Sequence, residues 1–142
     1  MTSTVVLGYD GSDSARAALR YAGERAADGH LFVVCVSEPP PPFLGSPYYQ
    51  RVLDESLGHA RKLGEEALGL LPPGGDVVTE LMQGSPSEAI VAVAQTRHAD
   101  EIVVGSRGLG KVRAALGSVS QDVLHLADRP VVVIPTPRRA TT

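Results

Sequence analysis

The sequence has very little cysteine: Cys35 is the only one among 142 residues. A single cysteine excludes an internal disulfide and a metal site built from several thiolates. Cys35 lies in the apolar run of residues 31–36, which favours a buried, inert thiol over a nucleophile. No apolar run approaches the roughly 20 residues that span a bilayer, and the first residues lack the charged and apolar regions of an export signal. We therefore expect a cytoplasmic protein.

Positive charge is not in excess, because the formal net charge is −3 at pH 7. This balance gives no electrostatic case for binding to DNA, RNA or an anionic membrane. The histidines, His30, His59, His98 and His125, have no metal-ligand spacing, so we interpret each as a surface or helix-end residue. No combination of nucleophile, base and acid stands out. The chain does not resemble an efficient enzyme.

Short apolar runs occur at residues 4–9, 31–36, 77–82, 102–104 and 130–135. They alternate with segments whose apolar residues recur every three or four positions, which is the spacing of amphipathic helices. Runs without internal alternation are typical of strands buried on both faces. The pattern predicts one α/β domain over residues 1–142, with a parallel sheet covered by helices on both faces. Residues 136–142 are expected to form a disordered tail.

Helix starts and a stiff loop punctuate this pattern. Ser12 is expected to cap the first helix, and Ser118 the last. Ser85, Pro86 and Glu88 have the spacing of a capping box with proline at the first helical position. The four prolines at 39–42 exclude a helix and a central strand, so we predict a surface loop there. A ligand for a proline-recognition domain remains the alternative.

A glycine-rich loop follows the fourth apolar run, with glycines at 105, 108, 110 and 117. Glycines allow a ligand to approach the backbone closely, and the helix that follows points its first amides at the loop. With Arg107 and Lys111 nearby, this composition suits an anionic phosphate chain. Such loops are often only turns. Asp10, Gly11 and Ser12 follow the first run, and if the first and fourth strands are neighbours, the two loops meet where α/β proteins bind nucleotides.

Known phosphate motifs do not match this loop. Gly110-Lys111-Val112 lacks the hydroxyl that a Walker loop uses to hold magnesium. No dinucleotide fingerprint follows the first run. Asp10 could accept a hydrogen bond from a sugar hydroxyl or hold a metal, and the alternative is an acid that only stabilises a helix start. Val36 could offer its backbone to an adenine edge, and the alternative is a plain core residue.

Several motifs together closely resemble those of the universal stress proteins, over nearly the whole chain. They are residues 5–12 (VVLGYDGS), Gly84-x-Pro86-x-x-x-Ile90, residues 105–108 (GSRG), residues 117–120 (GSVS) and residues 130–135 (PVVVIP). The resemblance implies a five-stranded flavodoxin-like sheet of order 3-2-1-4-5 and a homodimer. In the ATP-binding branch of the family, it implies a nucleotide between the first and fourth strands.

The resemblance also assigns roles to individual residues. Asp10 falls on the ribose or metal side, with Mg²⁺ held through the nucleotide, while Val36 and Val104 fall on the adenine side. Gly105 and Gly108 open the phosphate motif, and Gly117 with Ser118 closes it. The full set expected to bind nucleotide is Gly8, Tyr9, Asp10, Val36, Val104, Gly105, Arg107, Gly108, Gly117, Ser118, Val119 and Ser120.

One departure from the family pattern concerns the length of the loop. Residues 109–116 number eight where the pattern has nine, and one residue spans at most about 3.3–3.6 Å. The expected ligand is therefore ATP, with ADP or AMP as shorter alternatives.

Two alternatives to a nucleotide-binding regulatory protein of the stress response remain: a slow ATP hydrolase and a nucleotide-free dimeric scaffold. The apolar strand at residues 131–134 would lie at a sheet edge, and we expect a second copy to cover it in a homodimer.

Overall fold

The computed structural model describes residues 2–107 and 116–137. Strands and helices alternate along the chain as the sequence predicts. Their bounds are β1 (Thr4–Gly8), α1 (Asp13–Arg25), β2 (His30–Ser37), the 3-10 helix η1 (Pro42–Leu44), α2 (Tyr48–Leu70), β3 (Asp76–Gln83), α3 (Pro86–Thr96), β4 (Glu101–Gly105), α4 (Ser118–Leu126) and β5 (Val131–Ile134).

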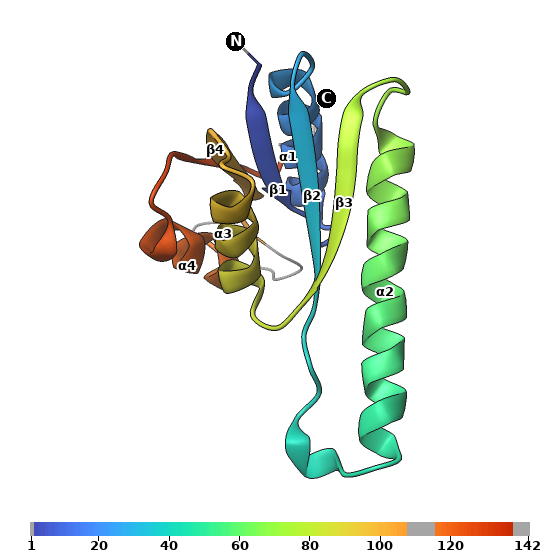
Figure 1. Cartoon of the computed structure of the whole chain (residues 1–142). Helices are drawn as coiled ribbons and strands as arrows, with labels where there is room; N and C mark the ends of the chain where they lie inside the picture. The colour runs from blue at the N-terminus through green and yellow to red at the C-terminus, as the bar shows by residue number, and fades with distance from the viewer. Residues whose placement is uncertain (1, 108–115, 138–142) are drawn as a thin grey trace, which may run out of the picture.

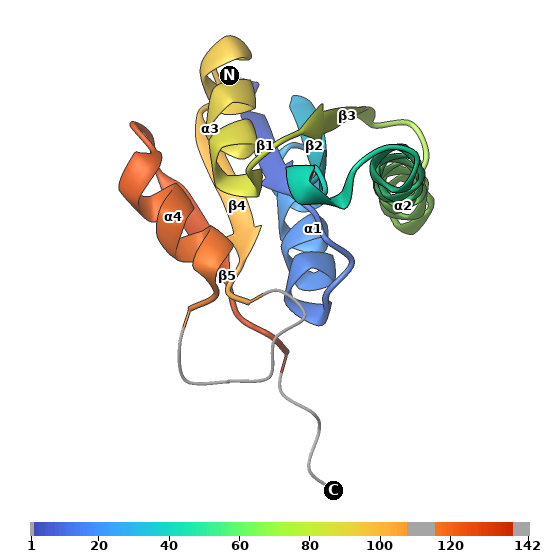
Figure 2. The same ribbon diagram turned by 90° about the horizontal axis from the view of Figure 1, so that it is seen from below.

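The strands form one parallel sheet of order β3-β2-β1-β4-β5, which confirms the predicted fold (Figure 1). Figure 2 shows α1 and α2 on one face of the sheet and α3 and α4 on the other. The chain passes from β3 back across the sheet to β4, so β1 and β4 are neighbours and the direction of strand addition reverses between them. In sheets of this kind the carboxyl ends of the strands at that reversal leave an open crevice.

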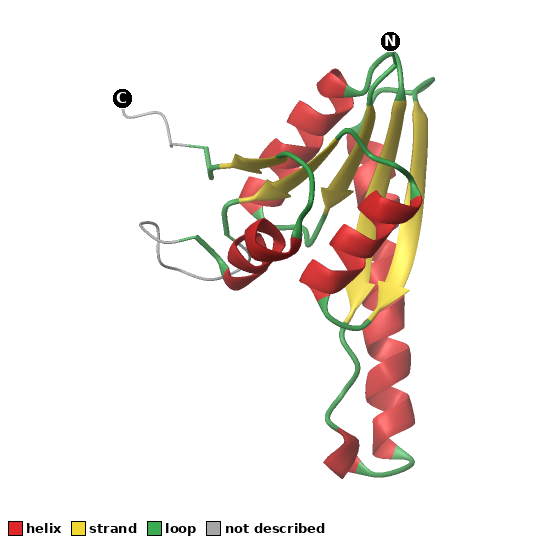
Figure 3. Cartoon of the chain, turned by 60° about the vertical axis from the view of Figure 1, so that its left-hand side comes forward, coloured by secondary structure: helices red, strands yellow, loops and turns green. Residues whose placement is uncertain are grey.

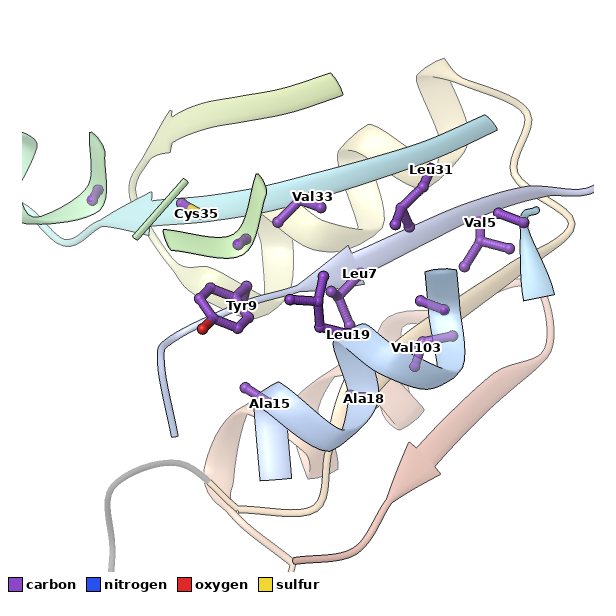
Figure 4. Close-up of a cluster of buried hydrophobic side chains, with 14 residues drawn as sticks. Val5, Leu7, Tyr9, Ala15, Ala18, Leu19, Leu31, Val33, Cys35 and Val103 are labelled. Atoms are coloured by element: carbon purple, nitrogen blue, oxygen red, sulfur yellow. The ribbon is translucent and has the colours of Figure 1, made fainter. Parts of the chain in front are cut away.

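Two apolar cores, one on each face, hold the sheet between its helices. Beneath α1 and α2, Leu7 and Val33 pack with Leu19 of α1 (Figure 4). On the other face Val6 and Ile102 pack with residues of α3 and α4. Because both faces are covered, β1, β2 and β4 are apolar without alternation. Cys35 is buried in the first core, which confirms the prediction of a buried cysteine. Its burial is the main reason that the pKa of its thiol is raised to about 11.

Helix α2 is longer than the sheet it covers and projects beyond it, with η1 near its far end (Figure 3). Its buried residues are small (Ala60, Gly64 and Ala67), which allows a close approach to β2 and β3. Helix α2 begins at Tyr48, before the first residue of the apolar periodicity in the sequence. The sequence did not reveal these first turns because they project beyond the sheet and need no apolar face. The exclusion of a helix at residues 39–42 is wrong at Pro42, which starts η1, where a missing N–H costs nothing.

Of the three predicted helix caps, only the first is confirmed in full. The Ser12 side chain accepts a hydrogen bond from the Ala15 amide. Ser85 occupies the cap position of α3, but its hydroxyl contacts that of Ser87 and makes no capping bond, so the capping box is wrong. The cap of α4 is Gly117, because the helix already includes Ser118, one residue earlier than predicted.

No helix within residues 2–107 and 116–137 combines the length and the apolar character needed to cross a membrane. Most of the predicted tail, residues 138–142, lies outside the described residues. Thr136 accepts a hydrogen bond of 2.8 Å from the Arg107 guanidinium.

Two glycines at strand ends permit close packing of helices. A Cβ at Gly8 would lie 2.4 Å from Cδ1 of Ile90 in α3. A Cβ at Gly105 would lie 2.5 Å from the Ser14 hydroxyl and 2.8 Å from the Ala15 nitrogen, both in α1. The obstruction at Gly105 includes main-chain atoms, which cannot turn away as a flexible side chain could.

We predict that Gly105→Ala lowers the free energy of unfolding by about 1–3 kcal/mol, the usual cost of overpacking, because α1 must shift. Gly58→Ala is the matched control, since nothing lies within 4 Å of a Cβ there and the helix of which it is part should gain about 0.5–1 kcal/mol. Urea unfolding of both variants measures the difference. Equal stability of Gly105→Ala and the wild type would show that this close approach imposes no constraint.

Candidate functional site

A cleft of about 350 Å³ opens at the carboxyl ends of β1, β2 and β4. Its volume lies in the range typical of small-molecule sites. All of the predicted site residues that the structure describes contribute to its lining, from β1, β2, β4, Arg107 and the start of α4, whereas Gly108 lies outside the described residues. Those residues are Gly8, Tyr9, Asp10, Val36, Val104, Gly105, Arg107, Gly117, Ser118, Val119 and Ser120.

One end of the cleft is polar and suited to an anion. The caps of α1 and α4, Ser12 and Gly117, both line it, together with Arg107. The first amides of a helix have no partner within the helix and carry partial positive charge. Gly117 has φ −68°, a value open to any residue, so its backbone does not require glycine.

Arg107 is anchored to the start of α1 and to the segment that follows β5. Its carbonyl accepts hydrogen bonds from Ser14 and, at 3.3 Å, from Ser12. Its guanidinium donates to Thr136, just beyond β5. A guanidinium carries five N–H donors, so this bond leaves donor capacity for a ligand.

Ser120 has a role that the sequence did not reveal. Its side chain is buried, and its hydroxyl lies within hydrogen-bonding distance of the carbonyls of Ser106 (3.0 Å) and Gly117 (2.9 Å). The hydroxyl therefore ties the start of α4 to the end of β4. Any contact that Ser120 makes with a ligand is expected through its main-chain amide.

The other end of the cleft, near β2, is largely apolar, with Glu38 and His59 as its polar residues. Val36 of β2 and Leu63 of α2 line it, with Pro86 and Ile90 of α3. Asp10 follows β1 between the two ends, and its Oδ1 accepts a hydrogen bond of 2.9 Å from the Ser12 amide. A carboxylate has acceptor capacity on both oxygens, so Asp10 can also accept from a ligand.

Tyr9 forms part of the floor and ties it to two helices. Its buried side chain donates a hydrogen bond of 2.8 Å to Glu66 of α2, and Arg16 of α1 donates to the same carboxylate oxygen. Burial, followed by the bond to Glu66, raises the pKa of Tyr9 to about 12. The bonds from Tyr9 and Arg16 hold the pKa of Glu66 below its ordinary value. Tyr9 therefore keeps its proton at neutral pH, and its bond to Glu66 holds its ring in the floor.

Several lining residues were not predicted, and they come mainly from the helix and loop walls: Ser12, Ala15, Val34, Glu38, His59, Leu63, Pro86 and Ile90. His59 is exposed, as expected, but it also faces the cleft from α2. The sequence places His59 and Leu63 one helical turn apart. It does not indicate which part of the sheet α2 covers.

The charged groups limit what the site can do. The described residues contain no cluster of three or more histidine, cysteine or acidic side chains that could hold a metal ion. Magnesium, however, often binds through one or two carboxylates together with the phosphates of its ligand. Asp10 can supply such a carboxylate, because it is hydrogen-bonded to Ser12, whose backbone lies at the polar end where phosphates would bind.

Comparison with known proteins agrees with the resemblance found in the sequence. The model of the Universal stress protein family matches residues 1–135. A Thermus aquaticus protein, described as "Universal stress protein in QAH/OAS sulfhydrylase 3'region", is 42% identical over 138 residues, covering 94% of this chain and 99% of that protein.

Two solved structures of similar fold contain adenine nucleotides. One is a universal stress protein in complex with cAMP, 30% identical with a TM-score of 0.62, over 95% of this chain and 98% of that one. The other is the universal stress protein from Archaeoglobus fulgidus in complex with dAMP, 26% identical with a TM-score of 0.57, over 94% of this chain and 98% of that one.

Proposed function

The chain belongs to the universal stress protein family, and we propose that it is a cytoplasmic regulatory protein of the stress response that binds an adenine nucleotide in its cleft. The ligand we propose is ATP with Mg²⁺, and turnover is slow or absent. ADP and AMP are the shorter alternatives that the test below compares.

The change from an apolar end to a polar end of the cleft is the observation that carries this proposal. A base fits between Val36, Leu63 and the residues of α3, while phosphates fit the amides of α4 and the guanidinium of Arg107. Asp10 lies between these ends, where a ribose or a phosphate-bound Mg²⁺ would be. A nucleotide has the same order of parts: an apolar ring, a sugar and an anion. The cAMP and dAMP complexes of two relatives support the choice of adenine.

The proposal of little turnover rests on the groups near the phosphate end. Tyr9 holds its proton, and Glu38 and His59 line the wall near β2, away from α4. Among the described lining residues this leaves Asp10 as the acid nearest that end, and it would be engaged with the sugar or Mg²⁺. No observation favours the slow hydrolase over the binding protein.

We expect calorimetry to detect ATP binding in millimolar Mg²⁺. Asp10→Asn should weaken that binding at least about tenfold, because a charge-assisted hydrogen bond contributes roughly 1.5–3 kcal/mol. Asparagine keeps a side-chain acceptor for the Ser12 amide, so the melting temperature should stay within a few degrees of the wild type. ADP and AMP titrations under the same conditions establish the preferred number of phosphates. A wild-type protein that binds none of the three contradicts the proposal and favours the nucleotide-free scaffold.

We also propose that the protein is a homodimer through β5. This edge strand consists of Val131–Ile134, all of them only half-buried, and it has no charged residue to discourage pairing. The opposite edge strand, β3, includes Asp76 and Glu80. An antiparallel β5 pair about a two-fold axis would cover the apolar edge in both copies.

The hydrogen bonds between β4 and β5 show which groups face a second copy. The carbonyl of Pro130 accepts a hydrogen bond from the Ile102 amide of β4, and the carbonyl of Ile134 accepts one from the Ser106 amide just after it. Because main-chain groups alternate in direction along a strand, those of Val132 also point towards β4. Those of Val131 and Val133 point outward.

Val133→Pro should therefore yield a folded monomer, because it removes one outward N–H and leaves the bonds to β4 intact. Val132→Pro is the comparison: it removes a bond within the sheet and should lower the melting temperature as well. Sedimentation at micromolar concentration, with circular dichroism to monitor folding, distinguishes these results. A wild-type monomer, or a Val133→Pro dimer, would contradict this interface.

A further inference from the structure

The apolar end of the cleft is bounded from both faces of the sheet. Leu63 and His59 line it from α2, and Pro86 and Ile90 line it from α3. These helices lie on opposite faces (Figure 2). A flat ring can therefore enter at the strand ends with one face towards α2 and the other towards α3. The shape of this end therefore favours planar groups, independently of any polar contact.

The face of α2 that lines the cleft is fixed in orientation. His59, Leu63 and Glu66 are spaced by four and three residues, so they lie on one stripe of the helix. Glu66 is held by Tyr9 and Arg16. One turn before His59, the hydroxyl of Ser56 lies 2.8 Å from that of Ser37 at the end of β2. The helix is thus tied to the sheet on both sides of His59.

His59 is the aromatic side chain among the described lining residues of the α2 and α3 walls, whereas the Tyr9 ring belongs to the floor. Imidazole rings stack on nucleic-acid bases, as phenyl and indole rings do. Resting on the proposed function, we propose that His59 stacks on the nucleotide base and makes the cleft prefer a purine to a pyrimidine.

Stacking explains the location of His59 better than phosphate binding does. Leu63 lies one turn along α2 from His59, and Val36 and Glu38 lie at the end of β2, the strand that α2 covers, whereas the amides of α4 and Arg107 form the polar end. A histidine that binds phosphate would be expected at that end. A purine has two fused rings and overlaps an imidazole over a larger area than a pyrimidine does, so loss of the imidazole costs a purine nucleotide more.

The test compares AMP with CMP, which share ribose and phosphate and differ only in the base. We expect the wild type to prefer AMP. His59→Ala should weaken AMP binding about tenfold, within the range measured when an aromatic residue is removed from beneath a base. CMP binding should weaken less, so the preference falls. His59→Phe should restore the preference, because it keeps a ring without the charge or the hydrogen-bonding nitrogens.

Arg61→Ala is the matched control, an exposed change on α2 outside the cleft lining that should leave both affinities unchanged. Equal affinity of the wild type for AMP and CMP would overturn the inference. It would also be overturned by an unchanged preference in His59→Ala, or by His59→Phe binding AMP as weakly as His59→Ala. If the wild type binds neither AMP nor CMP but does bind ATP in millimolar Mg²⁺, the same comparison is made with ATP and CTP. A wild-type protein that binds none of these nucleotides contradicts the proposed function itself, which separates the two failures.

Discussion

Helix α1 approaches the end of β4 so closely that residue 105 has no room for a side chain, and the rest of the cleft depends on this contact. The hydroxyls of Ser12 and Ser14 bond to the carbonyl of Arg107 across it. Together these contacts place the start of α1 beside the segment that leads from β4. The hydroxyl of Ser120 then ties the start of α4 to the same segment. Two helix N-termini consequently face one space, which becomes a site for an anion.

The glycines among the predicted nucleotide-binding residues therefore have different physical roles. Gly8 and Gly105 provide room for α3 and α1, so their first role is packing. Gly117 has an ordinary backbone conformation, and its role is to cap α4 where the helix start lines the cleft. These positions therefore combine two features: close packing of helices on the sheet and a helix start that lines the cleft. A nucleotide-binding role for this chain relies on both.

The alternation of short apolar runs with amphipathic segments was enough to predict a parallel sheet covered on both faces, because buried parallel strands need no polar side. The family resemblance supplied the strand order. Local signals were less reliable: Ser85 has the right spacing for a capping box, yet its hydroxyl contacts Ser87. The α2 wall was missed for a different reason. Whether His59 faces solvent or a ligand depends on where α2 lies over the sheet, and the pairing of Glu66 with Tyr9, distant in sequence, fixes that placement.

The central claim is that an adenine nucleotide binds with its base near β2 and its phosphates near α4. It is tested most directly by a nuclear magnetic resonance titration of the isotope-labelled protein with ATP in millimolar Mg²⁺. The account predicts that amide signals of Val36, Asp10 and residues 117–120 shift together and saturate at one ligand per chain. Amides of the outer strand β3 should remain unchanged. Shifts confined to the small hollow formed by Asp13, Arg16 and Arg20 on α1, or no saturable shift at all, would contradict the claim.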